Sequence, residues 1–451
     1  MVPSRSAITD ISAWLFAGAL LFAPWAYGCT VAWSILALEG IGGTILGLWI
    51  AGCFIERRLP VIDRWTALMV AWLLGQGWLM ALNAQFRYDS AHAAFASVQH
   101  WWASGPGTVD ASTSVGAMVR VTILLGLLIY AGDLGCRRTW RRRILWSFVA
   151  AGGSVALFGL VQHALGATAI FWAPRPPSIG FFGTYQYSGN AGAFLNLVLP
   201  LTVIAARQAF QDHVQWERAL AFPALAAITA GAFVNASRAA LVVTLLLIAL
   251  LAASAILFKR ASVRQARHIP KPVVLLATMA VAIIVPSAGW ESAAQKWGAL
   301  PSQLNTANPR LLAYTAELQM APDAGFWGFG PGTFEITFPH YTHFLGDSIR
   351  GIWRYAHNDY LQTLLEWGTI GAAAWALLFL RGLIGGFAAG TDQSRRNRER
   401  AFFLAASLSL AGMALHATVD FPFQIASLQL YAATLLGLTS TNARLPAAAE
   451  L

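Results

Sequence analysis

Residues 237–258 read SRAALVVTLLLIALLAASAILF, a polar opening followed by an apolar run long enough to cross a bilayer as one helix. Runs of about 17–25 residues of this kind recur along a chain that is 57% apolar and only 11% charged. They predict an all-α fold, a polytopic membrane bundle of about twelve helices, because helices satisfy their own backbone in lipid. The predicted helices cover residues 11–27, 31–54, 64–82, 116–132, 143–165, 187–206, 218–234, 238–258, 272–288, 359–387, 400–417 and 423–440.

Basic residues predict the orientation of this bundle. Arginine and lysine cluster at 57–64, 137–143, 259–271 and 395–400, which an even helix count places on the side of the N-terminus. The positive-inside rule makes that side cytoplasmic, so both termini are expected inside a bacterial inner membrane. The largest loop on the opposite, periplasmic side is 289–358, between the ninth and tenth helices, and a loop of such length is usually functional.

Composition and motifs exclude several classes of function. The net charge of +10 comes from basic residues spread over separate short loops, so it does not indicate nucleic-acid binding. The three cysteines are scattered and provide neither a disulfide framework nor the spacing of a metal site. H-E-x-x-H, D-x-D and G-x-S-x-G motifs are absent from the sequence. We therefore expect no cofactor and no bound metal.

Three ionisable residues on the predicted periplasmic side are candidates for chemistry. Arg238 lies in the first helical turn after the plausible N-cap Ser237, where the helix dipole disfavours a cation unless an anion is bound. Arg310 lies in the large loop, and His357 stands just before an apolar helix, where it could accept a proton. The structural alternatives are a lipid-headgroup anchor for Arg238, a solvated loop residue for Arg310 and a helix cap for His357.

Other polar residues are weaker candidates. Glu366 lies about two and a half turns into the helix that follows His357, and we interpret it as a structural residue first and a proton relay second. The glycine-rich segment 325–332 is expected to form a tight turn packed among aromatic residues rather than a phosphate-binding loop. Possible substrate-binding residues on the same side are Arg175, Arg120, His416 and Asp420.

Several blocks between residues 182 and 371 occur in a fixed order and carry a resemblance. They are FGTY at 182–185 with the stretch to Pro200, SRA at 237–239, PR at 309–310 with GFGPGTF at 328–334, and HNDYL at 357–361 with EWGTIG at 366–371. Together they resemble the O-antigen ligase and Wzy-type polymerase superfamily of bacterial envelope glycosyltransferases. The resemblance covers residues 180–440 and implies a GT-C-like bundle of membrane helices with a large periplasmic loop.

The resemblance also implies roles for the candidate residues. Two arginines of the family bind the diphosphate of an undecaprenyl-diphosphate-linked glycan, and a histidine activates the acceptor hydroxyl. Carried over by motif, Arg238 and Arg310 would bind the diphosphate and His357 would be the catalytic base of an inverting, metal-independent transfer. The acceptor could be a glycan, lipid A core or a protein, so ligase, polymerase and protein O-oligosaccharyltransferase activities all stay open.

Two other classes of function compete with this interpretation. A lipid or solute transporter would place ionisable groups near the bilayer midplane, where Glu39 and Glu366 are candidates and Glu39 has no obvious partner in the sequence. A structural scaffold in envelope assembly would be indifferent to the loss of His357. We interpret residues 1–451 as one integral membrane domain, with an O-antigen ligase-like region at 180–440 that includes the loop 289–358.

Overall fold

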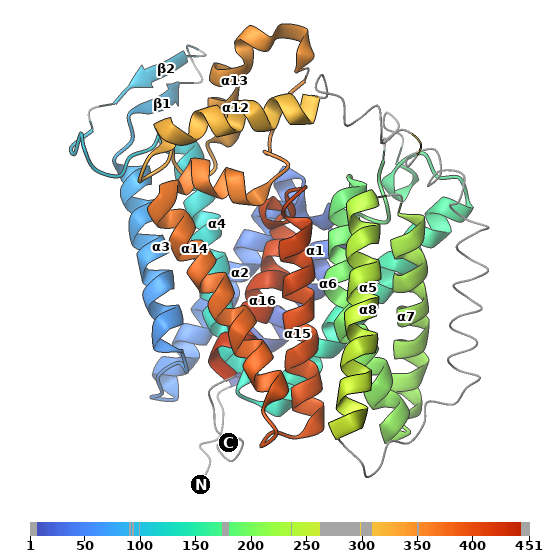
Figure 1. Ribbon diagram of the computed structural model, residues 1–451. Coiled ribbons are helices and arrows are strands. Elements are labelled where there is room, and N and C mark those ends of the chain that lie inside the picture. The colour runs from blue at the N-terminus through green and yellow to red at the C-terminus, as the bar shows by residue number, and fades with distance from the viewer. Residues whose placement is uncertain are drawn as a thin grey trace.

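The computed structural model is a bundle of long helices with a smaller cap at one end (Figure 1). It describes residues 7–261 apart from 90, 91, 93, 99, 174–179 and 236, then residue 298, and residues 309–442 apart from 350. The helices of the bundle are α1 (Ala7–Trp25), α2 (Ala32–Ile55), α3 (Arg64–Leu82), α4 (Ala111–Gly135), α5 (Arg138–Ala164), α6 (Ser188–Asp212), α7 (Gln215–Val234), α8 (Arg238–Ala261), α14 (Asp359–Thr391), α15 (Asn397–His416) and α16 (Ala426–Asn442).

These eleven bundle helices confirm eleven of the predicted ones, and the predicted helix 272–288 lies outside the described residues. Helix ends differ from the predicted ones where a capping side chain sets them. The helix α4 begins five residues before the predicted start, because the Asp110 side chain accepts a hydrogen bond from the Thr113 amide at 2.8 Å. In the described part of the chain, α1 to α7 and α14 are long and apolar enough to cross a membrane. The chain is a multi-pass helical membrane protein, and the count of twelve spans stays a prediction.

The centre of the bundle is formed by α6 and α16. Tyr431 of α16 is fully buried, with its ring 4.3 Å from Phe148 and 5.2 Å from Phe194 between ring centroids. Its hydroxyl donates to the Leu20 carbonyl, which satisfies the polar tip of a side chain that otherwise packs among apolar groups. This packing fixes the first turn of α6 and the corner before α16, and both belong to the candidate site described below.

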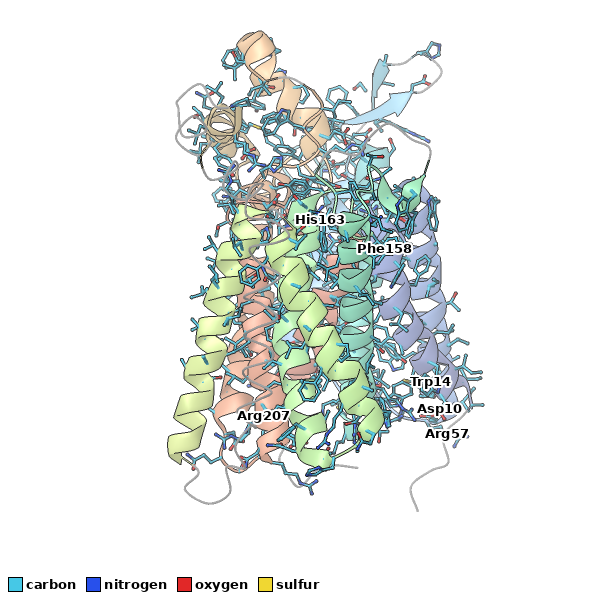
Figure 2. All side chains as sticks on the ribbon, turned by 90° about the vertical axis from the view of Figure 1, so that its right-hand side faces the viewer. Asp10, Trp14, Arg57, Phe158, His163 and Arg207 are labelled. Atoms are coloured by element: carbon cyan, nitrogen blue, oxygen red, sulfur yellow. The ribbon has the colours of Figure 1, made fainter. Side chains whose placement is uncertain are left out.

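The two ends of the bundle differ in charge. In Figure 2, Asp10 and Arg57 lie at the end away from the cap, whereas His163 lies near the cap. Ion pairs join the helices at the basic end, including Arg58 to Asp133 at 2.9 Å and others between Arg141 and Glu399, Arg142 and Glu217, and Arg398 and Asp212. The basic clusters at 57–64, 137–143 and 395–400 thus share the end opposite the cap. Which side of a membrane this end faces stays a prediction.

The cap consists of α12 (Pro309–Ala324), α13 (Phe334–Thr342), the 3-10 helix η3 (His343–Ser348) and a hairpin. Pro309 begins α12, where proline suits the first helical position because its missing N–H would have no partner there. The hairpin pairs β1 (Phe86–Asp89) with β2 (Ala94–Ser97) in antiparallel register. The all-α prediction missed it, because strands of four residues are too short for an alternating pattern to stand out.

The cap is joined to the bundle by an exchange of backbone hydrogen bonds. α14 is interrupted at Gly368, which adopts φ 64° and ψ −175°, so the predicted continuous helix is in fact broken. The glycine-rich segment enters this break: the amides of Phe329 and Gly330 donate to the carbonyls of Leu365 and Glu366 at 2.9 and 3.0 Å. In return, the amides of residues 369 and 370 donate to the carbonyls of residues 325 and 326. The segment is therefore a packed turn with its backbone groups satisfied.

We expect Gly368→Ala to destabilise the protein strongly. A Cβ at this position would lie 2.3 Å from the Phe326 carbonyl oxygen, and the positive φ adds strain for any L side chain. A loss of about 2–5 kcal/mol is expected from strain and overpacking together. Thermal unfolding of detergent-solubilised protein measures it. Gly116→Ala in α4 is the matched control, because a Cβ there meets nothing within 4 Å; equal melting temperatures for the two variants would contradict the prediction.

Candidate active site

Four helices begin close to one another at the cap end of the bundle, and each start carries a polar or ionisable side chain. Tyr187 is the N-cap residue of α6, and Arg238 is the first residue of α8. Arg310 is the second residue of α12, and His357 lies two residues before α14. The N-terminus of a helix carries partial positive charge and outward-pointing amides. Such a group of helix starts favours the binding of an anion.

His357 lies beside a buried carboxylate. Its Nδ1 is 3.4 Å from Oδ1 of Asp420, and Oδ2 of Asp420 is 3.6 Å from Nε2 of His416. Both distances are long for hydrogen bonds, so these contacts are mainly electrostatic. Burial by itself would raise the pKa of Asp420, but the two imidazoles outweigh it and hold the pKa at about 2. Asp420 is thus ionised at neutral pH and faces Nδ1 of His357, which leaves Nε2 to exchange a proton.

The first turn of α6 approaches Asp420 closely. A Cβ on Gly189 would lie 2.2 Å from Oδ2 of Asp420, so this approach requires a residue without a side chain. The positive end of the helix therefore adds to the imidazoles in stabilising the carboxylate. Asp420 is held as an anion by its whole surroundings rather than by one partner.

The corner between α15 and α16, which carries Asp420, is fastened to the start of α14. The Asn358 side chain accepts hydrogen bonds from two backbone amides in the first turn of α14. It also donates a hydrogen bond of 3.1 Å to the Thr418 carbonyl. The Asp359 amide donates to a carbonyl of the corner, and the Asp359 carboxylate accepts from the Phe423 amide at 2.7 Å. The residues next to His357 thus fix the distance between the histidine and Asp420.

The backbone and ring of His357 are both constrained. Its φ of +54° is uncommon for a residue with a side chain, and such conformations persist only where the surroundings enforce them. The Tyr314 hydroxyl donates to the His357 carbonyl at 2.9 Å. The imidazole packs edge-on against Phe421 and Trp353, with centroid separations of 4.8 and 5.5 Å. With 21% of the side chain exposed, the histidine remains accessible to a substrate.

Arg310 and Tyr187 present donors next to this histidine. The Arg310 guanidinium is exposed and donates to the Tyr187 hydroxyl at 3.4 Å, while the rings of Tyr187 and His357 are 6.4 Å apart. Burial, with the nearby Asp420 charge, raises the pKa of Tyr187, so its phenol stays protonated. A guanidinium fork and a phenolic O–H together suit the oxygens of a phosphate.

Arg238 reaches the same region through the start of α8. The Ser237 side chain accepts a hydrogen bond from the Ala240 amide at 3.3 Å, so it acts as the N-cap that the sequence indicated. The Asn235 side chain donates to the Ser188 carbonyl at 2.8 Å, which holds the start of α8 beside the start of α6. Arg238 is half-buried there. Its position next to the helix that carries Tyr187 is compatible with a shared anion.

Residues 223–376 match the family model described as O-antigen ligase. This segment belongs to the O-antigen ligase family. It covers about a third of the chain and includes Arg238, Arg310 and His357, whereas Tyr187 and Asp420 lie outside it. The family indicates a ligase or polymerase type of function in polysaccharide biosynthesis, with a glycosyltransferase-like activity. No curated protein matches the chain.

The remaining predicted residues of this O-antigen ligase-like chain have other partners. Arg120 pairs with Glu39 at 3.0 Å inside the bundle, so Glu39 has the partner that its sequence context did not reveal. The Glu366 carboxylate accepts hydrogen bonds from the amides of Gly332 and Phe334, which supports a structural role in fastening the cap. Arg175 lies outside the described residues.

Two tyrosines of the candidate site were missed by sequence reasoning. Tyr187 is the first residue of the predicted helix 187–206, and Tyr314 lies one helical turn after Arg310, on the same face of α12. The spacing of Arg310 and Tyr314 was therefore a usable signal. Tyr187 offered none, because its contact with Arg310 joins residues 123 positions apart.

A buried acid lies in the cap. Glu317 of α12 is fully buried, and neither carboxylate oxygen has a hydrogen-bond partner among the described residues. Burial raises its pKa to about 9. The folded-state pKa lies above the unfolded value of 4.5, so stability is greatest below that value and falls as the pH rises towards 9. At neutral pH the folded protein keeps the Glu317 carboxyl protonated, whereas in the unfolded chain the same group is ionised. Taking up this proton on folding costs free energy and lowers the stability of the protein.

We expect Glu317→Met to stabilise the protein at neutral and alkaline pH. The substitution removes the protonation cost, which is roughly 3 kcal/mol at pH 7, and fills the same space with an apolar chain. Melting temperatures of the detergent-solubilised variant and parent should differ more at pH 8 than at pH 5. A difference of equal size at both pH values would show that packing, rather than titration, causes the change.

Proposed function

We propose that the protein is an inverting, metal-independent membrane glycosyltransferase that moves a glycan from undecaprenyl diphosphate to an acceptor hydroxyl. The observation that carries this proposal is the His357–Asp420 pair beside Arg310, at a group of helix N-termini in an O-antigen ligase domain. A base and an anion site next to each other are what transfer from a diphosphate donor requires.

The proton step rests on the histidine. The acceptor oxygen attacks the anomeric carbon while Nε2 of His357 removes the hydroxyl proton, because a sugar hydroxyl is a poor nucleophile without a base. The Asp420 carboxylate, 3.4 Å from Nδ1, stabilises the imidazolium that forms. A single displacement of this kind inverts the anomeric centre.

The leaving-group step rests on the positive charges. As the bond between the anomeric carbon and the phosphate oxygen breaks, its electron pair passes to undecaprenyl diphosphate. Arg310 and Arg238 would stabilise that charge with bidentate hydrogen bonds, and the starts of α6, α8, α12 and α14 would add amides and partial positive charge. The cap would keep the reacting groups out of bulk water, where such interactions are weaker.

The setting in the cell forms part of the proposal. We place the protein in the bacterial inner membrane, with the cap in the periplasm and the basic end in the cytoplasm, as the positive-inside rule favours. Transfer to lipid A core would make the protein a ligase, and transfer to a growing glycan would make it a polymerase. Transfer to a protein hydroxyl would make it an O-oligosaccharyltransferase.

Reconstituted transfer tests the proposal. Purified protein in liposomes containing undecaprenyl-diphosphate-linked glycan should yield glycosylated acceptor, and a chelator should leave the rate unchanged. Membranes of a ligase-null strain and of a polymerase-null strain, each complemented with this chain, should then separate the two activities. Absence of transfer by folded protein to glycan, lipid and protein acceptors alike would overturn the proposal.

A further inference from the structure

A groove opens in the cap between α13 and the segment that follows η3. It has a volume of about 260 Å³ and is lined, among others, by Glu335, Phe338, Thr342, His343, Ile352 and Trp353. This volume lies just below the range of about 300–1,000 Å³ that is usual for small-molecule sites. The groove therefore suits the end of a glycan, one or two sugar units, better than a whole polysaccharide.

The floor of the groove is aromatic, and one of its rings packs against the histidine. The ring of Phe338 lies 5.7 Å from that of Trp353, which in turn lies 5.5 Å from His357. One side chain, Trp353, thus lines the groove and contacts the proposed base. A ligand seated in the groove would contact the same tryptophan that packs against the proposed base.

The edge of the groove is polar. Glu335 in the first turn of α13 has 45% of its side chain exposed and lies 3.8 Å from Arg354, a separation too long to neutralise it fully. His343 and Thr342 add further hydrogen-bonding groups to the lining. An aromatic floor with a few polar groups at its edge can pack against the apolar face of a sugar ring and bind its hydroxyls.

The groove and the phosphate-binding donors meet the ring of His357 through different side chains. Trp353 lines the groove, whereas Tyr187 contacts Arg310. The proposed base removes a proton from the acceptor hydroxyl, so the acceptor has to lie next to His357. A groove that shares Trp353 with the proposed base is therefore placed for the acceptor.

We infer that the groove between α13 and residues 351–353 binds the acceptor saccharide, with Glu335 and Trp353 as its main contacts. The inference rests on the proposed glycosyl transfer and specifies the class of acceptor: a saccharide end is recognised directly by the cap. An acceptor that is a protein without sugar, or a lipid recognised through its chains, would make no use of this groove.

Direct binding tests the inference apart from transfer. The probe is a fluorescently labelled oligosaccharide released by mild acid from the host's own surface glycolipid, titrated into the full-length purified protein. Undecaprenyl diphosphate is titrated separately. Glu335→Ala and His343→Ala should weaken oligosaccharide binding about tenfold each and leave undecaprenyl diphosphate binding unchanged, which also shows that the variants are folded. Asp323→Ala is the matched control, because this cap carboxylate binds Tyr341 outside the groove lining.

The possible results separate the two proposals. Oligosaccharide binding that is absent in the parent, or unchanged in both groove variants, would overturn the acceptor groove. Groove-dependent binding of the oligosaccharide without any binding of undecaprenyl diphosphate would support the groove and count against the proposed donor. In turnover, the groove variants should raise KM for the acceptor alone; a rise in KM for the donor alone would assign the groove to the donor glycan and overturn the inference.

Discussion

His357→Ala is expected to lower kcat for glycan transfer by about 10²–10⁴-fold, with small changes in KM for the donor. The expected loss is that of a general base, because the acceptor hydroxyl would then have to surrender its proton to water. Reconstituted transfer from undecaprenyl-diphosphate-linked glycan measures it. Because the imidazole helps to stabilise the buried Asp420 anion, its removal should also lower the melting temperature, so both proteins are assayed at a temperature at which they are folded.

Two further variants make this result specific. His163→Ala is the matched control, since His163 is an exposed histidine at the same end of the bundle (Figure 2) and should transfer at the parent rate. Asp420→Asn should also lower kcat, because the amide cannot stabilise the imidazolium as the carboxylate does. Transfer at the parent rate by folded His357→Ala would remove the histidine from the mechanism and favour a scaffold or transport role.

The helices were predictable from the sequence because lipid imposes a single requirement. A segment that crosses it must be apolar over about 20 residues and must satisfy its own backbone, so length and composition suffice. The break in α14 escaped prediction for the same reason. At Gly368 the backbone groups freed by the break form hydrogen bonds with the inserted segment 325–330. The residue pattern of a single helix does not reveal hydrogen-bond partners that come from elsewhere in the chain.

The candidate site could be predicted in part. Arg238, Arg310 and His357 are ionisable residues at helix starts, and the cost of placing them there is visible in the sequence. Their grouping was not visible, because it depends on contacts such as that between Tyr187 and Arg310 across distant helices. Asp420 was expected only as a secondary residue. Its role next to His357 arises from the corner between α15 and α16, which lies 63 positions later in the chain.

Arg310→Ala is expected to lower kcat by about 10²–10³-fold, the usual loss when one donor to a developing anion is removed. Arg310→Lys should restore only part of the rate, because an ammonium supplies charge without the planar fork that binds two phosphate oxygens. Initial rates at saturating donor and acceptor measure the change. Arg87→Ala is the control, since this exposed arginine belongs to the hairpin of the cap and should have no effect on transfer.

The comparison of KM with kcat shows which state Arg310 stabilises. An arginine that only anchors the donor would raise its KM and leave kcat unchanged, because bound substrate and transition state would lose the same contact. An arginine that stabilises the charge appearing on the leaving diphosphate would lower kcat instead. If Arg238 and Arg310 act on the same diphosphate, the double alanine variant should lose less than the product of the two single effects. Independent, multiplicative losses would place the two arginines on different anions.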